Sequence, residues 1–181
     1  MNQFNAFIIC ILTFFGCGSP MKSLVTEDCI TNNSDFAPIK TSGSDNYTLA
    51  VHDNATLFLF QDGEQIVPQI ENGKKLVFEY RYTKSVNPLM KDAGYNESIL
   101  FEIDPEVNKF LLNGALLEKA KAMYGNLCFC PDAGYHPIKE GCIRGKKTGK
   151  DEWQVDINIK AYGTDREFTK MLSEKFTKSG N

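Results

Sequence analysis

The chain has 181 residues, of which 42% are hydrophobic and 24% are charged, and these proportions exclude a disordered protein. The formal net charge is −3, so the chain lacks the broad positive field that attracts nucleic acid, and we expect no nucleic-acid partner. The length fits one domain with a hydrophobic core after a processed leader, since domains typically have about 100–150 residues.

Residues 1–16 form an apolar leader without a charged side chain. Its hydrophobic run extends from Ala6 to Phe15, which is about half of the roughly twenty residues that a membrane-spanning helix needs. The segment is therefore typical of the apolar core of a secretory signal peptide.

The leader ends in Phe14-Phe15-Gly16-Cys17, where a small residue directly precedes a cysteine. This segment resembles the lipobox of bacterial lipoproteins, although Phe14 stands where that motif usually has Leu. The resemblance implies cleavage before Cys17, a diacylglycerol thioether on its sulfur and acylation of the new amino group, and several acyl chains are enough for stable membrane anchoring. The alternative is an ordinary cleaved signal with Cys17 as a structural thiol.

The chain as a whole resembles uncharacterised lipoproteins of Gram-negative bacteria, particularly the Asn-, Lys- and Phe-rich kind common in the Bacteroidota. The specific part of this resemblance covers about residues 1–20. It implies a place in the cell envelope, with the membrane as a partner through the lipid anchor. The segment Gly18-Ser19-Pro20 carries no acidic residue, so we expect the outer membrane, with the protein facing the periplasm.

Residues 17–46 are rich in Ser, Thr, Asn, Asp and Pro and predict a lipidated N-terminus followed by a flexible tether. The pattern changes at Tyr47, and we expect a single β-rich domain over residues 47–181. Residues 57–60 form a continuous apolar run that suits a strand buried on both faces. Residues 76–82 and 99–103 alternate apolar with polar side chains, which is typical of half-buried strands.

A helix is predicted from Asn113, as the N-cap, to Gly125, as the C-terminal glycine. Its apolar stripe has helical spacing and consists of Leu116, Leu117, Ala120, Met123 and Tyr124.

The C-terminal part of the chain predicts further strands. Residues 153–161 alternate strictly and pair in a hairpin with residues 141–146 through a turn at residues 148–151. Residues 166–178 suit a strand or a helix, and the strand is favoured because a turn directly precedes them. Six to eight strands with one short helix indicate an antiparallel β-sandwich or a small β-barrel.

Four of the six cysteines remain once Cys10 leaves with the leader and Cys17 takes the lipid. These are Cys29, Cys128, Cys130 and Cys142. An even number in an oxidising compartment predicts two disulfides, and the preferred pairing joins one of Cys128 and Cys130 to Cys142 and the other to Cys29. The alternatives are free thiols, or a metal site in which His136 joins Cys128, Cys130 and Cys142; we expect no metal and no cofactor.

Three side-chain groups deserve a functional interpretation beside the structural one. One group is a basic patch that contains Arg144, Lys146, Lys147 and Lys150, with Lys139 nearby. It is a candidate for binding an acidic partner, a polysaccharide or lipid headgroups. The alternative is a strand edge whose charges keep it soluble. An aromatic set suits either a platform for sugar rings or the core; it contains Tyr47, Phe78, Tyr80, Tyr82 and Trp153. The carboxylates of Glu102 and Asp104 suit either the paired carboxylates of a glycosidase or a solvated strand face that leads into a turn, and the solvated face is expected.

No catalytic signature is present, and the only histidines are His52 and His136. We therefore expect no enzyme, although a cleft in which one of them meets a carboxylate and a nucleophile would change that interpretation. The function expected is a membrane-anchored envelope protein that binds a protein or glycan partner or serves structurally. The alternative is a calycin-like barrel with a small hydrophobic ligand, which requires an accessible apolar cavity.

Overall fold

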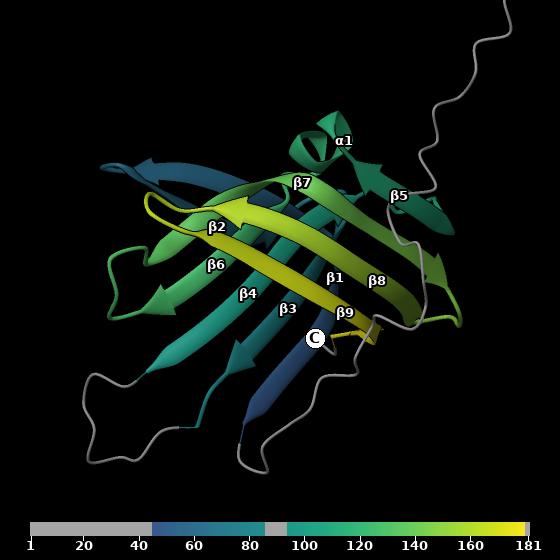
Figure 1. The fold of residues 1–181 in the computed structure, drawn as a ribbon. Coiled ribbons are helices and arrows are strands. Elements are labelled where there is room, and N and C mark those ends of the chain that lie inside the picture. Colours follow the sequence, from purple (N-terminus) through teal and green to yellow (C-terminus); the bar gives the residue numbers. More distant parts are fainter. Residues whose placement is uncertain (1–44, 86–93, 180–181) are drawn as a thin grey trace, which may run out of the picture.

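The computed structural model describes residues 45–85 and 94–179. The leader, Cys17, Cys29 and the tether as far as residue 44 lie outside these residues, whereas Asn46, which was assigned to the tether, already begins the first strand. The described part is mainly β with one short helix, as predicted (Figure 1). Its elements are β1 (Asn46–Asp62), β2 (Gln65–Asn72), β3 (Lys75–Thr83), β4 (Tyr95–Ile103), β5 (Lys109–Asn113), α1 (Ala115–Lys119), β6 (Met123–Cys128), β7 (Gly134–Lys147), β8 (Glu152–Tyr162) and β9 (Glu167–Lys178).

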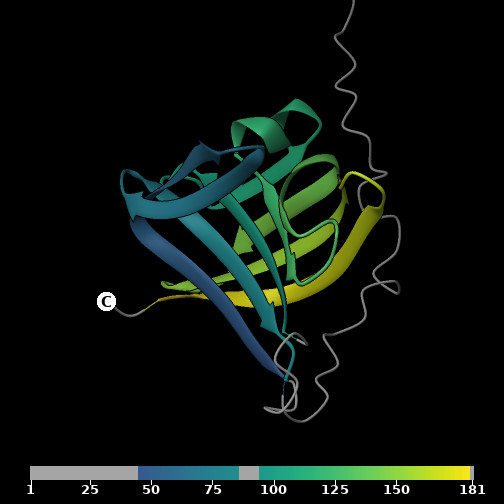
Figure 2. The ribbon, with the colours of Figure 1, turned by 90° about the vertical axis from the view of Figure 1, so that its left-hand side faces the viewer.

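One curved sheet contains all the strands (Figure 2). Antiparallel neighbours follow the order β1-β3-β4-β6-β7-β8-β9. The last strand of this series returns to the first, because Thr177 and Lys178 of β9 pair in parallel with Ala50 and Val51 of β1. The sheet therefore encloses a core between its inner surfaces.

The second half of β1 leaves this ring and forms an outer layer with β2. A register irregularity separates His52 from Ala55 in the pairing with β3, and from Ala55 onward β1 pairs with β2. This β1–β2 hairpin packs on the outer face of β3 and β4, where Leu57, Val77 and Leu100 form a second apolar cluster. Two apolar clusters on the two faces of β3 and β4 are consistent with a β-sandwich.

The main core lies on the inner face. In β8 the alternation predicted from the sequence is confirmed, and every inward side chain from Trp153 to Ala161 is buried. The Phe78 ring contacts four other aromatic rings, with centroid distances of 4.8 Å to Phe101, 5.5 Å to Phe110, 5.5 Å to Trp153 and 5.8 Å to Phe176. These rings fill one end of the inner face.

The hairpin layer reverses two burial predictions. Residues 76–80 were expected to be half-buried, yet all five are buried, because β1 and β2 cover the outer face of β3. Residues 57–60 were expected to be buried on both faces, yet the Phe58 side chain is 49% exposed, because the hairpin has solvent on its own outer side.

Glu102 is likewise not on a solvated face. It is 8% exposed and accepts hydrogen bonds from the Leu57 backbone N–H at 2.7 Å and from Thr56 Oγ1 at 3.0 Å. Lys121 completes the arrangement with an ion pair to Glu102 at 2.9 Å. The buried Glu102 carboxylate therefore links the hairpin layer to β4 through hydrogen bonds. Asp104, by contrast, is exposed, as predicted.

The predicted helix from Asn113 to Gly125 is wrong in both of its limits. Helix α1 has five residues and follows Gly114, and Lys121 then adopts a φ of 51° that turns the chain into β6. Met123 and Tyr124 pair with Leu100 and Ile99 of β4, so hydrogen bonding to the sheet prevails over the helical spacing of their side chains. No helix among residues 45–85 and 94–179 is long and apolar enough to span a bilayer.

The C-terminal predictions are confirmed. Residues 141–147 of β7 pair with residues 153–159 of β8 in a hairpin, and β9 over Glu167–Lys178 is a strand. Gly141 has a φ of +92°, and a Cβ there would lie 2.1 Å from the Asn158 carbonyl oxygen, so the close approach of β7 and β8 requires glycine at this position.

Candidate functional site

An ion pair lies on the inner face of the sheet, where a core would normally be apolar. Glu97 of β4 alternates with the core residues Ile99 and Phe101, and Lys170 of β9 lies between Phe168 and Leu172. The Lys170 Nζ donates to Glu97 Oε2, and the two side chains are 24% and 12% exposed. The pair therefore joins two strands across the inside of the sheet.

Tyrosine side chains surround this pair, and together they form what we call the tyrosine end of the inner face. They come from β1, β3, β4 and β6 and are Tyr47, Tyr80, Tyr82, Tyr95 and Tyr124. The Tyr95 hydroxyl donates to Glu97 Oε1 at 2.6 Å. The Lys170 Nζ lies 5.3 Å from the Tyr80 ring centroid and 5.8 Å from that of Tyr82, which is within the range of a cation–π contact.

Three rings of this end form a connected, partly exposed surface. The ring centroids of Tyr47 and Tyr82 are 5.2 Å apart, and those of Tyr82 and Tyr95 are 6.2 Å apart. The Tyr82 hydroxyl donates to Asp45 Oδ2 at 3.0 Å. Each of the three side chains is partly buried, so each ring is held in place and still meets solvent.

The tyrosines keep their protons at physiological pH. Burial raises the pKa of Tyr82 to about 12, helped by its bond to Asp45, and burial raises the pKa of Tyr95 to about 12, helped by its bond to Glu97. Burial also raises the pKa of Tyr80 and of Tyr124. The tyrosine end therefore presents neutral hydroxyl groups that both donate and accept hydrogen bonds.

The Tyr80 hydroxyl has no hydrogen-bond partner within the part of the chain that the structure describes. Its side chain is 1% exposed. A buried hydroxyl without a partner costs about 1–3 kcal/mol of stability. The Tyr80 hydroxyl therefore has an unused capacity to donate and to accept a hydrogen bond inside the tyrosine end.

The aromatic platform predicted from the sequence forms only in part. Tyr47, Tyr80 and Tyr82 come together, whereas Phe78 and Trp153 pack in the apolar end of the core. The sequence pattern did not identify Tyr95, Glu97 or Lys170 as members of this group. The signal for Glu97 was present, since it extends the alternation of residues 99–103 by one inward position.

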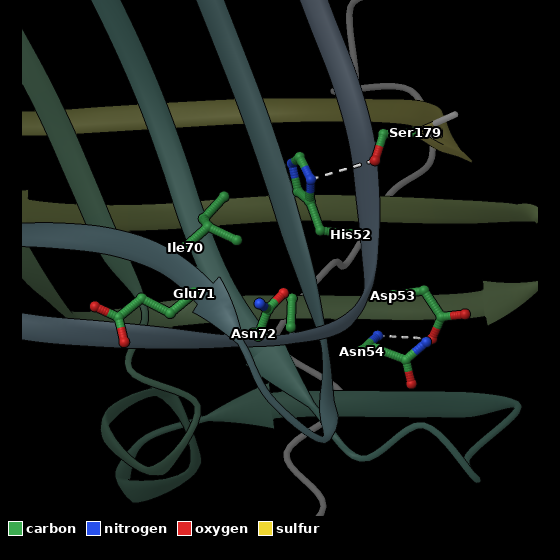
Figure 3. Close-up of a pocket in the computed structure, with 8 residues that line it drawn as sticks. His52, Asp53, Asn54, Ile70, Glu71, Asn72 and Ser179 are labelled. Carbon is green, nitrogen blue, oxygen red and sulfur yellow. Dashed lines mark hydrogen bonds between the residues drawn. The ribbon is translucent and has the colours of Figure 1, made fainter. Parts of the chain in front are cut away.

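A second feature is a pocket of about 570 Å³ beside the bulge of β1, which we call the bulge pocket (Figure 3). It is lined by His52, Asp53, Asn54, Ala55, Ile70, Glu71, Asn72 and Ser179. The Ser179 hydroxyl lies 3.2 Å from His52 Nδ1, and His52 Nε2 lies 2.8 Å from Glu79 Oε2. The sequence interpretation named His52 but had no means of joining it to the other two residues.

Glu79 is the buried member of this chain of contacts and is 6% exposed. The hydrogen bond from His52 lowers the pKa of Glu79, and the neighbouring Arg81 guanidinium lowers it further against the opposing effect of burial. The carboxylate is thus ionised and lies between His52 and Arg81.

The predicted basic patch divides between two surfaces. Lys147 and Lys150 line a pocket of about 310 Å³ with Lys178 and Trp153. Arg144 and Lys146 do not line it, because strand alternation directs Arg144 to the outer face, where it pairs with Asp156 at 2.7 Å. Lys178 is itself paired with Asp53 at 2.7 Å, which reduces the positive charge of the pocket.

The preferred disulfide pairing is wrong. Cys128 and Cys130 are bonded to each other, with their Cα atoms 5.3 Å apart, because the chain bends directly after β6 and brings them side by side. Cys142 is also disulfide-bonded, and its partner is neither of these two. In residues 45–85 and 94–179 no cluster of three or more His, Cys, Asp and Glu side chains is placed to hold a metal ion.

Ligands have candidate sites in the bulge pocket, in the lysine-lined pocket and in a pocket of about 460 Å³ beside Asp132 and His136. The tyrosine end is a further candidate because a charged pair and several hydroxyl groups lie on the inner face of the sheet. Comparison with protein-family models, with curated proteins and with solved structures found no match for this chain.

Proposed function

We propose that this protein is a lipid-anchored envelope protein whose β domain binds a glycan, with the tyrosine end holding a sugar ring. The observation that carries the proposal is the Glu97–Lys170 pair on the inner face, together with the buried Tyr80 hydroxyl, which lacks a hydrogen-bond partner among residues 45–85 and 94–179.

Stability alone does not account for the tyrosine end. Replacing a buried ion pair with well-packed apolar side chains is often neutral or stabilising, and the opposite end of the same inner face is packed in that way. A polar interior that also contains an unpartnered hydroxyl is more typical of a binding site, where a few placed polar groups orient a ligand.

The chemistry of the tyrosine end matches an uncharged, hydroxyl-rich ring. The Tyr47 and Tyr82 rings offer flat apolar surface to the C–H face of a sugar. Glu97, Lys170 and Tyr80 offer acceptors and donors to its hydroxyl groups. Because Glu97 and Lys170 neutralise each other, a neutral sugar fits better than a charged one.

The lipid anchor rests on the sequence. The apolar leader and the lipobox-like segment ending at Cys17 support attachment to a membrane, and the tether would hold the domain beside the outer membrane on its periplasmic side. Envelope glycans are within reach of a domain held there.

The alternative ligand, a small hydrophobic molecule, has weaker support. It requires an apolar interior cavity. The rings around Phe78 occupy one end of the inner face, and an ion pair occupies the other. Neither end offers a purely apolar space.

Isothermal titration calorimetry with neutral oligosaccharides tests the glycan proposal. The probes are cellotetraose, maltotetraose and chitotetraose, supported by an array of envelope glycans. We expect binding by the wild type and a loss of at least tenfold in affinity for Tyr82→Ala, which removes a ring of the exposed surface. Phe58→Ala is the matched control, because Phe58 is an exposed aromatic residue outside the tyrosine end.

Two results would contradict the glycan proposal. One is the absence of binding across the array by the folded wild type, and the other is equal affinity in Tyr82→Ala. The anchor is tested separately by intact mass spectrometry of the protein from membranes, where Cys17→Ser should release an unacylated chain. A wild-type protein without acyl chains would contradict the lipid anchor and would leave the glycan-binding proposal unaffected.

A further inference from the structure

The bulge pocket places a hydroxyl, an imidazole and a carboxylate in sequence. Ser179 Oγ and His52 Nδ1 are 3.2 Å apart, and His52 Nε2 and Glu79 Oε2 are 2.8 Å apart. Both distances are within the reach expected between a nucleophile, its base and the group that orients the base. Figure 3 shows Ser179 and His52 turned toward each other at the edge of the pocket.

The buried Glu79 carboxylate determines which nitrogen of His52 carries the proton. An ionised carboxylate only accepts hydrogen bonds, so His52 Nε2 must be the donor. In the neutral ring His52 Nδ1 is then unprotonated and accepts the hydroxyl proton of Ser179. This is the protonation state in which an imidazole acts as a general base.

The backbone holds these groups in place. The bulge between His52 and Ala55 alters the direction of β1, and Asn54 has a φ of 50° there. Ser179 directly follows β9, and its backbone N–H donates to the Val51 carbonyl oxygen at 3.0 Å. The Lys178–Asp53 ion pair at 2.7 Å joins the same two segments. Bulges are common beside active sites because they redirect a side chain.

We propose that the bulge pocket is a hydrolytic site for an uncharged carboxylic ester with a small acyl group. Ser179 is the nucleophile, His52 is the general base and Glu79 is the positioning residue. This activity goes beyond glycan binding and uses none of the residues of the tyrosine end.

The pocket lining indicates the substrate class. Glu71 disfavours an anionic substrate, since the other carboxylate of the lining, Asp53, is neutralised by Lys178. Ala55 and Ile70 offer a limited apolar surface that suits a short acyl chain. Asn54 and Asn72 line the same pocket, and asparagine side-chain amides are among the groups that stabilise the oxyanion formed when a carbonyl is attacked.

The reaction follows from these roles. The Ser179 oxygen bonds to the carbonyl carbon while its proton moves to His52 Nδ1, and the C–O bond to the alcohol then breaks as the alcohol takes that proton. Water attacks the acyl-serine, gives its proton to His52 and releases the carboxylic acid as the proton returns to Ser179. The net change is ester plus water to acid plus alcohol.

A fluorophosphonate probe tests the site directly on the processed protein. We expect a phosphonyl adduct on Ser179, located by peptide mass spectrometry, and hydrolysis of 4-nitrophenyl acetate by the same protein. Ser179→Ala should abolish labelling, and His52→Gln should slow it by about a hundredfold or more, since general-base catalysis contributes roughly 10²–10⁴-fold. Ser85→Ala, which changes an exposed serine, should label at the wild-type rate.

Labelling at another residue, or equal labelling of His52→Gln and the wild type, would overturn the proposal. Circular dichroism establishes whether each variant is folded. If Ser179→Ala does not fold, Ser179→Cys takes its place. The thiol introduced in that variant should react with iodoacetamide faster when His52 is present than in the His52→Gln background. Tyr82→Ala should lose glycan binding and keep labelling, so the two sites fail independently.

Discussion

The two ends of the inner face differ in the side chains that fill them: one end is aromatic and apolar, and the other is polar. At the apolar end, the ring centroids of Phe101, Trp153 and Phe176 lie 4.8–5.8 Å from that of Phe78, and each of these four residues is at most 2% exposed. At the tyrosine end, inward positions of the same strands hold a charged pair and a buried hydroxyl that has no partner in the described part of the chain.

This difference separates stability, at the apolar end, from the glycan recognition proposed for the tyrosine end. Burial of aromatic rings stabilises the fold in proportion to the apolar area removed from water. Polar groups at the other end contribute less to stability, because part of their hydrogen-bonding capacity is unused. The comparison therefore makes opposite predictions for changes at the two ends.

The largest loss of stability is expected from Phe78→Ala. Phe78 is fully buried and contacts four rings, so truncation should reduce the free energy of unfolding by about 3–5 kcal/mol. Urea denaturation followed by circular dichroism measures the change. Phe58→Ala, which truncates an exposed ring, should reduce the free energy of unfolding by less than about 1 kcal/mol. Equal losses in the two variants would contradict the view that the apolar end provides most of the stability.

The second prediction concerns Glu97→Gln, which leaves Lys170 without its counterion on the inner face. Breaking a fully buried pair costs about 3–5 kcal/mol, and partial exposure of Lys170 should reduce this to about 2 kcal/mol. Adding Lys170→Met to this variant should restore stability but not glycan affinity. A double variant no more stable than the single one would show that the pair is not coupled.

Alkaline pH should destabilise the protein through the tyrosine end. Burial raises the folded-state pKa of Tyr82 and Tyr95 from 10 to about 12. Stabilisation by these neutral hydroxyls is complete below pH 10 and is lost as the pH rises toward 12, because the unfolded chain releases its protons first. Unfolding free energy measured across that range should fall less steeply in Tyr82→Phe/Tyr95→Phe; an unchanged slope would be inconsistent with the predicted shifts.

The smallest effect is expected from Tyr80→Phe. Removing a buried hydroxyl that has no partner should leave stability unchanged or raise it by up to about 1 kcal/mol. Glycan affinity should fall, since the ligand loses a hydrogen bond. A loss of stability greater than about 1 kcal/mol in thermal denaturation would show that the hydroxyl is already satisfied.

The strands that the sequence predicts well are those whose evidence is local. Alternation with a period of two identifies residues 99–103 and 153–161, because neighbouring side chains of a strand point to opposite faces. Burial of the outer face of β3 escaped prediction, because it depends on a hairpin that passes over that strand. The helix limits failed for a similar reason, since pairing with β4 decided the conformation of Met123 and Tyr124.

The candidate sites were less accessible to prediction than the fold. Tyr80 and Tyr82 were identified because they share an alternating pattern, and Tyr47 was grouped with them as a further aromatic residue. His52 is 27 positions from Glu79 and 127 positions from Ser179, and only the meeting of β1, β3 and β9 brings the three residues together. The Cys128–Cys130 pairing depends on a bend that strand geometry alone does not suggest.

The pairing of β1 with β9 has a consequence for the order of folding. Ala50 and Thr177 meet from nearly opposite ends of the domain, so the circle of strands stays open until the last strand has been synthesised. Contacts between such distant positions slow folding, because a long loop must close first. A chain that completes its fold this late remains unfolded for longer during synthesis, as the export proposed above would require.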